Sequence, residues 1–317
     1  MDLGSFSSNL TKLQYLDLRH TNALIKVEDI QRMEMLECFG GAFDCNYYNQ
    51  YMQKYLDMFF GLKTYHLRIG NVYGESSVRW ERINLMRFVP NEPETKTILF
   101  RDCDHFSHIL PKDLTCMHIE KNSNWVCLCD ALSYNTSSSL RKIETNDCQQ
   151  LESLFCLSGS CSFCTKIHNL EVLELKSLES LTVVCKDVDV GQSLSPGGIF
   201  SCLKYFSIFG CNLIEKLFTP QLVLQLQNLE KILVSNCASM KEIFAESNSD
   251  DDDSSSITLP KLSLLGLYCD LPQLKTVCKG IIRCGYSKPT LYCPGLKRRP
   301  PTVKLIDVES PYFGIFP

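Results

Sequence analysis

Apolar residues recur at one fixed spacing along most of this chain. Counted from Leu203, and again from Leu229, apolar residues hold the first, fourth, sixth, twelfth and fifteenth positions, and cysteine holds the ninth. The fourth and sixth residues alternate with outward-facing ones, and this period of two predicts a short β-strand with one face inward. The twelfth and fifteenth residues are expected to pack into the same core from the other side. Each copy therefore predicts a strand followed by a return segment.

The frame returns about ten times, and a period of this length with this pattern defines a leucine-rich repeat. The copies begin at Leu13, Met33, Leu62, Thr95, Leu114, Leu140, Leu170, Leu203, Leu229 and Leu262. The copy at Met33 is weak, with Leu36 and Cys38 taken as its strand positions. We expect an α/β repeat solenoid, an irregular leucine-rich-repeat horseshoe. Its concave side is a parallel β-sheet, and loops and short helices form the convex side. At the ninth position a small polar side chain is expected to donate to backbone carbonyls of the turn.

The repeats predict one long domain over residues 1–299, followed by a C-terminal tail over residues 300–317. Three insertions interrupt the period. Residues 43–60 are rich in Tyr, Gln, Asn and Met and are expected to form a helix against the convex face. Residues 185–200 carry a Gly, Ser and Pro loop signature, and residues 247–256 form an acidic, serine-rich tract that is expected to be disordered. After Leu267 the register is expected to slip by one residue. The chain begins inside a repeat without a polar capping unit, which favours a truncated receptor or fragment.

Composition and charge narrow the class of protein. The chain is 44% hydrophobic and 21% charged, as in folded proteins, and its net charge is −4. A nucleic-acid-binding protein would carry a clustered excess of basic residues, so this charge balance argues against that class. No apolar run reaches the ~18 residues of a membrane span, and no secretory signal is visible, so we expect a cytoplasmic protein. Its 18 cysteines are interpreted as reduced packing residues.

The sequence contains few candidates for catalytic, cofactor-binding or metal-binding residues. No nucleophile motif accompanies the histidines and no phosphate-binding loop occurs, so we expect no enzyme, no catalytic residue and no cofactor. Cys161-x-x-Cys164 followed by His168 is the best metal candidate, with Cys127, Cys129 and Cys156 near it in the sequence. We favour an inter-repeat loop with packing cysteines, and assign no metal site.

The candidate function lies on the outward positions of the strand ladder. The middle repeats place charged residues there, whereas residues 205–268 place apolar and aromatic ones. An exposed apolar patch of this kind indicates a protein contact; alternatively, an insertion or a neighbouring domain covers it. The candidate partner-binding residues are Tyr205, Ser207, Phe209, Lys231, Leu233, Ser235, Leu264, Tyr268, Glu144, Glu174, Lys176, His66 and His118.

Several segments resemble one family. Residues 10–21 resemble the early repeats of plant intracellular disease-resistance receptors. Residues 228–244, with their Cys-x-x-Met-x-x-Ile-Phe ending, are similar to the late repeats of the coiled-coil, nucleotide-binding (NB-ARC), leucine-rich-repeat class, as are residues 259–267 and 292–298. The resemblance implies the sensor and autoregulatory region of an immune receptor, which binds a pathogen effector, a guarded host protein or the receptor's nucleotide-binding domain. The family's ADP/ATP site lies in a domain that this sequence lacks.

Two other readings stay open. The chain is alternatively the substrate-recognition module of a ubiquitin-ligase adaptor, whose repeats also use cysteine at the ninth position. An F-box helix ahead of Leu13 would support that reading, and none is present in the sequence. The other alternative is a small enzyme or metal protein built around Cys161, Cys164 and His168.

Overall fold

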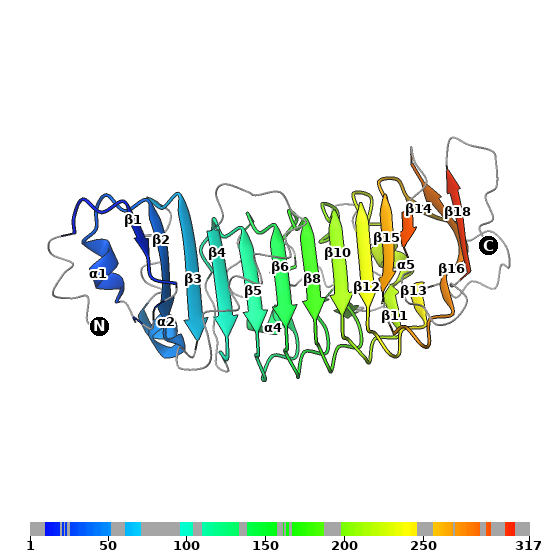
Figure 1. Cartoon of the computed structure of the whole chain (residues 1–317), viewed down its shortest axis with the longest axis horizontal. Helices are drawn as coiled ribbons and strands as arrows, with labels where there is room; N and C mark the ends of the chain where they lie inside the picture. The colour runs from blue at the N-terminus through cyan, green and yellow to red at the C-terminus, as the bar shows by residue number, and fades with distance from the viewer. Residues whose placement is uncertain are drawn as a thin grey trace.

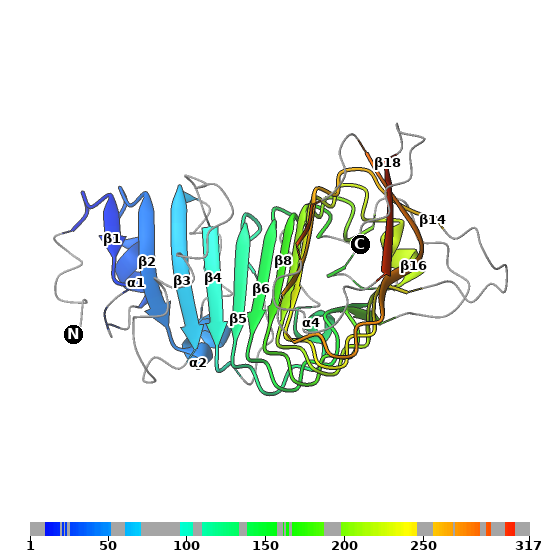
Figure 2. The ribbon, with the colours of Figure 1, turned by 45° about the vertical axis from the view of Figure 1, so that its right-hand side comes forward.

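The computed structural model describes residues 10–307 apart from 20, 22, 24–25, 52–60, 71–95, 104–109, 133–137, 157–160, 162, 165–166, 187–197, 246–255, 269, 286–289 and 293–301. The strands stand side by side along the long axis of the molecule and follow the order of the chain (Figure 1). The return segments lie behind them (Figure 2).

One parallel sheet of 11 strands forms the front of the molecule. Its strands, in spatial order, are β1 (Tyr15–Asp17), β2 (Cys38–Phe43), β3 (Thr64–Gly70), β4 (Lys96–Arg101), β5 (Cys116–Glu120), β6 (Lys142–Asn146), β8 (Val172–Lys176), β10 (Tyr205–Phe209), β12 (Lys231–Ser235), β15 (Leu264–Tyr268) and β17 (Thr290–Tyr292). Every neighbouring pair that we describe is parallel. The predicted leucine-rich-repeat solenoid is therefore confirmed.

The core follows the repeat frame. In the copy that begins at Leu203, the residues Leu203, Phe206, Ile208, Ile214 and Leu217 are all buried. Aromatic rings then link one repeat to the next, since the centroids of Phe206 and Phe218 lie 5.0 Å apart. No single repeat encloses these side chains, so each repeat depends on its neighbours for burial.

The chain leaves β4, β5, β6, β8, β10 and β12 through a left-handed residue at the eighth position. Lys121, Asp147, Ser177 and Asn236 have φ between 51° and 57°. There the N–H points sideways to the next strand, as Ser177 N donates to Phe209 O at 2.8 Å. The eighth residue is polar or glycine because left-handed backbone disfavours bulky and β-branched side chains.

The ninth residue caps the turn, as predicted. The Sγ atom of Cys237 donates to the carbonyl of Ser235 at 3.3 Å, and that of Cys103 donates to the carbonyl of Ile69 at 3.3 Å. We call these residues the ladder cysteines, namely Cys103, Cys148, Cys211 and Cys237. All four are buried.

Short elements form the convex side. They are the helices α1 (Val27–Gln31), α2 (Cys45–Tyr51), α4 (Leu128–Ala131) and α5 (Pro220–Val223), and the strands β7 (Phe155–Cys156), β9 (Cys185–Lys186), β11 (Lys216–Phe218), β13 (Glu242–Phe244), β14 (Ser256–Leu259), β16 (Thr276–Cys284) and β18 (Thr302–Asp307). Helix α2 confirms a helix within residues 43–60, and its buried Tyr48 packs against Phe100 with ring centroids 6.3 Å apart. No described helix is long and apolar enough to cross a membrane.

The other insertions fall mostly outside the described residues. This holds for residues 187–197 and for residues 246–255, so neither the loop nor the disordered tract is tested. Strand β18 lies within the segment expected to be a tail and pairs with β16. The predicted register slip is confirmed, because Leu271 and Val277 are buried and Leu274 packs against the core.

The repeat frame is wrong at the N-terminal end. Phe39, not Leu36, lies opposite Leu16 of β1 and Tyr65 of β3, so the second copy begins at Leu36 rather than Met33. Met33 is buried because it closes a turn after α1, where its N–H donates to Ile30 O at 2.9 Å. Met33 and Leu36 are three residues apart on this turn, and the first and fourth positions of the repeat have the same spacing.

A second shift separates β3 from β4. Leu67 lies opposite Ile98, whereas the repeat frame predicts that it lies opposite Phe100, two residues later in β4. His66 consequently faces Thr97 and falls in the row of Cys116, not in the row of His118. Residues 71–95 separate the two strands in the sequence. This separation is longer than in the regular repeats, and the pairing of β3 with β4 does not follow the repeat spacing.

Candidate protein-binding face

Side chains on the sheet face form rows that cross the strands. One row runs through Cys116, Lys142, Val172, Tyr205, Lys231 and Leu264. The next runs through His118, Glu144, Glu174, Ser207 and Leu233, and a third through Lys176, Phe209, Ser235 and Tyr268. Because parallel strands bring equal repeat positions side by side, 12 of the 13 predicted partner-binding residues lie in these rows. The thirteenth residue, His66, lies beyond these stretches, where the first row extends to β3 and Thr97 of β4 separates it from Cys116.

Five residues of β5, β6 and β8 make one ionic network, which we call the charged cluster: His118, Lys142, Glu144, Glu174 and Lys176. Glu144 sits at its centre. The Oε2 atom of Glu144 lies 3.1 Å from Nδ1 of His118, and its Oε1 atom lies 2.5 Å from Nζ of Lys176. Glu174 joins the two lysines, at 2.7 Å from Lys142 and 3.0 Å from Lys176. The cluster fixes the side chains of three adjacent strands.

The cluster holds its members in their charged forms. Burial lowers the pKa of His118, but Cys116 and Glu144 raise it more strongly, to about 10. Burial would raise the pKa of Glu144, yet His118, Lys142 and Lys176 hold it well below its usual range. His118 and Glu144 therefore stabilise each other's charged forms.

Cys116 extends the charged cluster along β5. Its Sγ atom lies 3.2 Å from Nε2 of His118 and is half-buried. The two residues share a face because residues two apart lie on the same side of an extended strand.

Beyond β8 the sheet face becomes apolar. We call Tyr205, Phe209, Leu233, Leu264, Tyr268 and Tyr292 the aromatic patch. Phe209 is 46% exposed and Tyr292 is 49% exposed, and the rings of Tyr268 and Tyr292 lie 5.4 Å apart. Tyr292 belongs to β17, a strand that the sequence analysis missed because Leu291 keeps the fourth position of the frame while Lys288 holds the first and Cys293 the sixth.

Gly266 makes room for the side chains of the aromatic patch. A Cβ atom at Gly266 would lie 2.5 Å from Cε2 of Tyr268 and 2.7 Å from Cδ2 of Leu233. The ring and the leucine therefore lean over the glycine from two sides. The remaining predicted residues Ser207, Lys231 and Ser235 are half-buried between the larger side chains.

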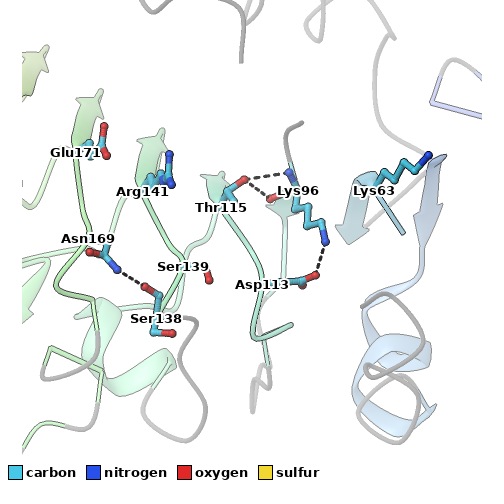
Figure 3. Close-up of a pocket in the computed structure, with 9 residues that line it drawn as sticks. All are labelled: Lys63, Lys96, Asp113, Thr115, Ser138, Ser139, Arg141, Asn169 and Glu171. Atoms are coloured by element: carbon cyan, nitrogen blue, oxygen red, sulfur yellow. Dashed lines mark hydrogen bonds and ion pairs between the residues drawn. The ribbon is translucent and has the colours of Figure 1, made fainter. Parts of the chain in front are cut away.

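A polar pocket of about 480 Å³ opens along the edge where the strands begin (Figure 3). Nζ of Lys96 lies 2.6 Å from Oδ2 of Asp113, and Asn169 donates to the carbonyl of Ser138 at 2.7 Å. These groups already satisfy one another. The pocket therefore has the character of a hydrated rim beside the sheet face rather than a substrate site.

Cys161, Cys164 and His168, the best metal candidate in the sequence, do not come together as one group. His168 is exposed, whereas Cys161 and Cys164 lie with Cys129 and Cys156 behind the sheet. The other two sulfur atoms of this group come from Cys129 of the preceding repeat and from Cys156, and His168 is not part of the group.

The fold and the rows of its sheet face define a leucine-rich-repeat protein. A family model described as plant disease resistance protein RPS2-like, leucine-rich repeats, matches residues 184–284. Residues 184–284 are therefore similar to leucine-rich repeats of the plant disease-resistance type. A probable disease resistance protein of Arabidopsis thaliana is 31% identical over 127 residues, which cover 40% of this chain and 13% of the relative. The match thus spans a small part of that relative. No solved structure matches the chain.

Proposed function

We propose that this chain is the sensor and autoregulatory region of a plant immune receptor. It recognises protein without catalysing a reaction, and it binds a pathogen effector or a guarded host protein through the sheet face. The disease-resistance type of its repeats supports the setting, and such repeats are typically recognition modules. The same face is proposed to dock on a receptor's nucleotide-binding domain when no effector is bound.

The observation that carries the proposal is the border between the charged cluster and the aromatic patch. Lys176 lies opposite Phe209, and Glu174 lies opposite Ser207 on the neighbouring strand. Aromatic anchors supply most of the binding energy at protein interfaces, while adjacent fixed charges select the partner and its orientation. Both kinds of group lie on parallel strands of the sheet, so binding costs little backbone conformational entropy.

We also propose a cytoplasmic location. The ladder cysteines cap carbonyl groups through S–H donors, which requires them to remain thiols. Reducing compartments keep cysteines in that form. Cell fractionation with a tagged chain tests this point directly.

The experiment that tests the function is co-precipitation of the purified chain with a separately expressed nucleotide-binding domain of the coiled-coil receptor class. We compare Ser235→Arg, which places a bulky charge beside Phe209 on the sheet face, with Leu213→Arg, whose side chain is 52% exposed away from that face. Capture that Ser235→Arg abolishes and Leu213→Arg leaves intact supports the proposal. Failure to capture the domain, with capture of a ubiquitin-ligase subunit instead, would move the adaptor reading ahead.

A further inference from the structure

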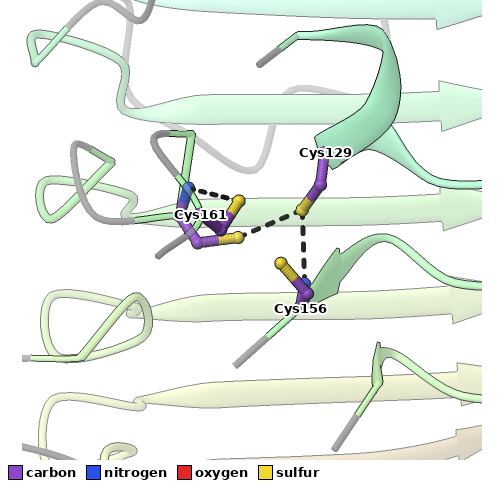
Figure 4. Close-up of side chains that lie close together, drawn as sticks. Cys129, Cys156 and Cys161 are labelled. Atoms are coloured by element: carbon purple, nitrogen blue, oxygen red, sulfur yellow. Dashed lines mark hydrogen bonds between the residues drawn. The ribbon is translucent and has the colours of Figure 1, made fainter. Parts of the chain in front are cut away.

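Four cysteine side chains converge behind the sheet, on the convex side of β5, β6 and β8. They are Cys129 of α4, Cys156 of β7, and Cys161 and Cys164 of the segment that precedes β8. All of their Sγ atoms lie within 4.8 Å of one another. Figure 4 shows three of them pointing toward a common centre from separate segments.

The spacing of the sulfur atoms suits one small tetrahedral ion. With a Zn–S bond of about 2.3 Å, the sulfurs of a four-cysteine zinc site lie about 3.8 Å apart. The Sγ atoms of Cys129 and Cys164 are 3.2 Å apart, much longer than a disulfide bond of about 2.05 Å. The two residues are therefore thiols, and small movements would bring the four sulfurs to the tetrahedral distance.

Backbone N–H groups already point at two of the sulfurs. Cys156 N donates to Sγ of Cys129 at 3.2 Å, and Cys164 N donates to Sγ of Cys161 at 3.4 Å. Such donors stabilise the negative charge of metal-bound thiolates and orient the ligands. This is a second observation, independent of the proximity of the sulfurs, that favours metal ligation.

The four cysteines do not follow the packing pattern of the repeat. The ladder cysteines each occupy the ninth position of their repeat and cap carbonyl groups. Cys129, Cys156, Cys161 and Cys164 all lie in return segments, and they come from three different pieces of chain. A packing role needs no such convergence, whereas metal binding requires it.

We propose that Cys129, Cys156, Cys161 and Cys164 bind one zinc ion that ties the return segments of adjacent repeats together. Each thiol gives up its proton on binding, and the zinc keeps its charge throughout. The ion would hold the convex side behind the strands that carry the charged cluster.

The test measures zinc in the full chain, expressed with zinc and purified under reducing conditions. We expect about one zinc per chain, and a loss of at least about tenfold in Cys156→Ser with Cys161→Ser. Both positions are half-buried, which spares the core. The matched control is Cys202→Ser, also half-buried and outside the cluster, which should keep its zinc. A folded wild-type chain without zinc, or a double variant that retains it, would overturn the proposal.

A second measurement does not depend on the variants folding. Alkylation of the wild-type chain, followed by peptide mapping, compares the protein before and after zinc removal by a chelator. We expect Cys129, Cys156, Cys161 and Cys164 to react only after removal, while the reactivity of Cys202 stays the same. Equal reactivity of the four cysteines with and without added zinc would contradict the site. Replacement by cobalt should give the absorption of tetrahedral cobalt with sulfur ligands, and an octahedral spectrum would count against it.

Discussion

His118 lies opposite Glu144 on the neighbouring strand, and its Nδ1 atom is 3.1 Å from the Oε2 atom of that carboxylate. Both side chains are less than one-tenth exposed. A buried carboxylate and a buried imidazole at this distance stabilise each other's charged forms, so the fold depends on the protonation of His118.

This dependence predicts how stability changes with pH. The pKa of His118 is raised from 6.5 to about 10 in the folded chain. A raised pKa stabilises the fold fully below about pH 6.5, and the stabilisation is lost as the pH rises towards about 10. We expect denaturant titrations between these values to show a decline in the wild type that is weaker in His118→Gln. Parallel curves for the two proteins would contradict the assignment, since the other titrating groups are common to both.

Glu144 is predicted to be the residue of the charged cluster that tolerates substitution least. Glu144→Gln leaves His118, Lys142 and Lys176 with Glu174 as the only carboxylate of the cluster, and breaking a buried ion pair costs about 3 kcal/mol. The matched control is Glu171→Gln, which breaks the exposed pair with Lys204 at the rim and should cost less than about 1 kcal/mol. Urea unfolding measures both values. Equal losses of unfolding free energy in the two variants would show that the cluster stabilises the fold no more than the exposed ion pair does.

The aromatic patch is predicted to matter for binding and not for folding. Tyr205→Ala combined with Phe209→Ala removes two side chains that face outward, and we expect at least about a tenfold loss of affinity for a captured partner. The melting temperature should stay close to that of the wild type. Leu224→Ala at the C-cap of α5 is the control, because Leu224 is 72% exposed but lies off the sheet. Titration by surface plasmon resonance or calorimetry measures the affinity, and unchanged affinity of the double variant would remove the patch from the interface.

The sequence predicted what the repeat determines by itself. Burial of Leu203, Phe206 and Ile208 follows from their spacing, because only one phase of the period places all three inward. The capping role of Cys237 follows from a small donor at a fixed place in the turn. Both features depend on residues close to each other in the sequence.

Features that depend on how strands pair were not predictable in the same way. The frame failed at Phe39 and Ile98, because an extra turn and a long connection change the pairing without changing the local pattern. The sequence reading named Glu144 and Lys176 as contact residues, yet nothing in it showed that they form an ion pair. The sequence analysis noted Cys129 and Cys156 near Cys161 and Cys164 in the chain but did not predict that the four sulfur atoms meet, because that depends on how the return segments pack.

A charge placed in the core tests the register of the whole sheet. Ile232 is buried between Phe206 of β10 and Leu265 of β15. In Ile232→Asp the carboxylate would have no partner in an apolar interface, and we expect a loss of more than about 4 kcal/mol. Because each repeat is stabilised by its neighbours, hydrogen exchange should show loss of protection on β10 and β15 as well as on β12. The control is Leu233→Asp, one residue later and facing outward, which should leave protection intact. Reversed behaviour of the two variants would mean that the assigned inward and outward faces of β12 are exchanged.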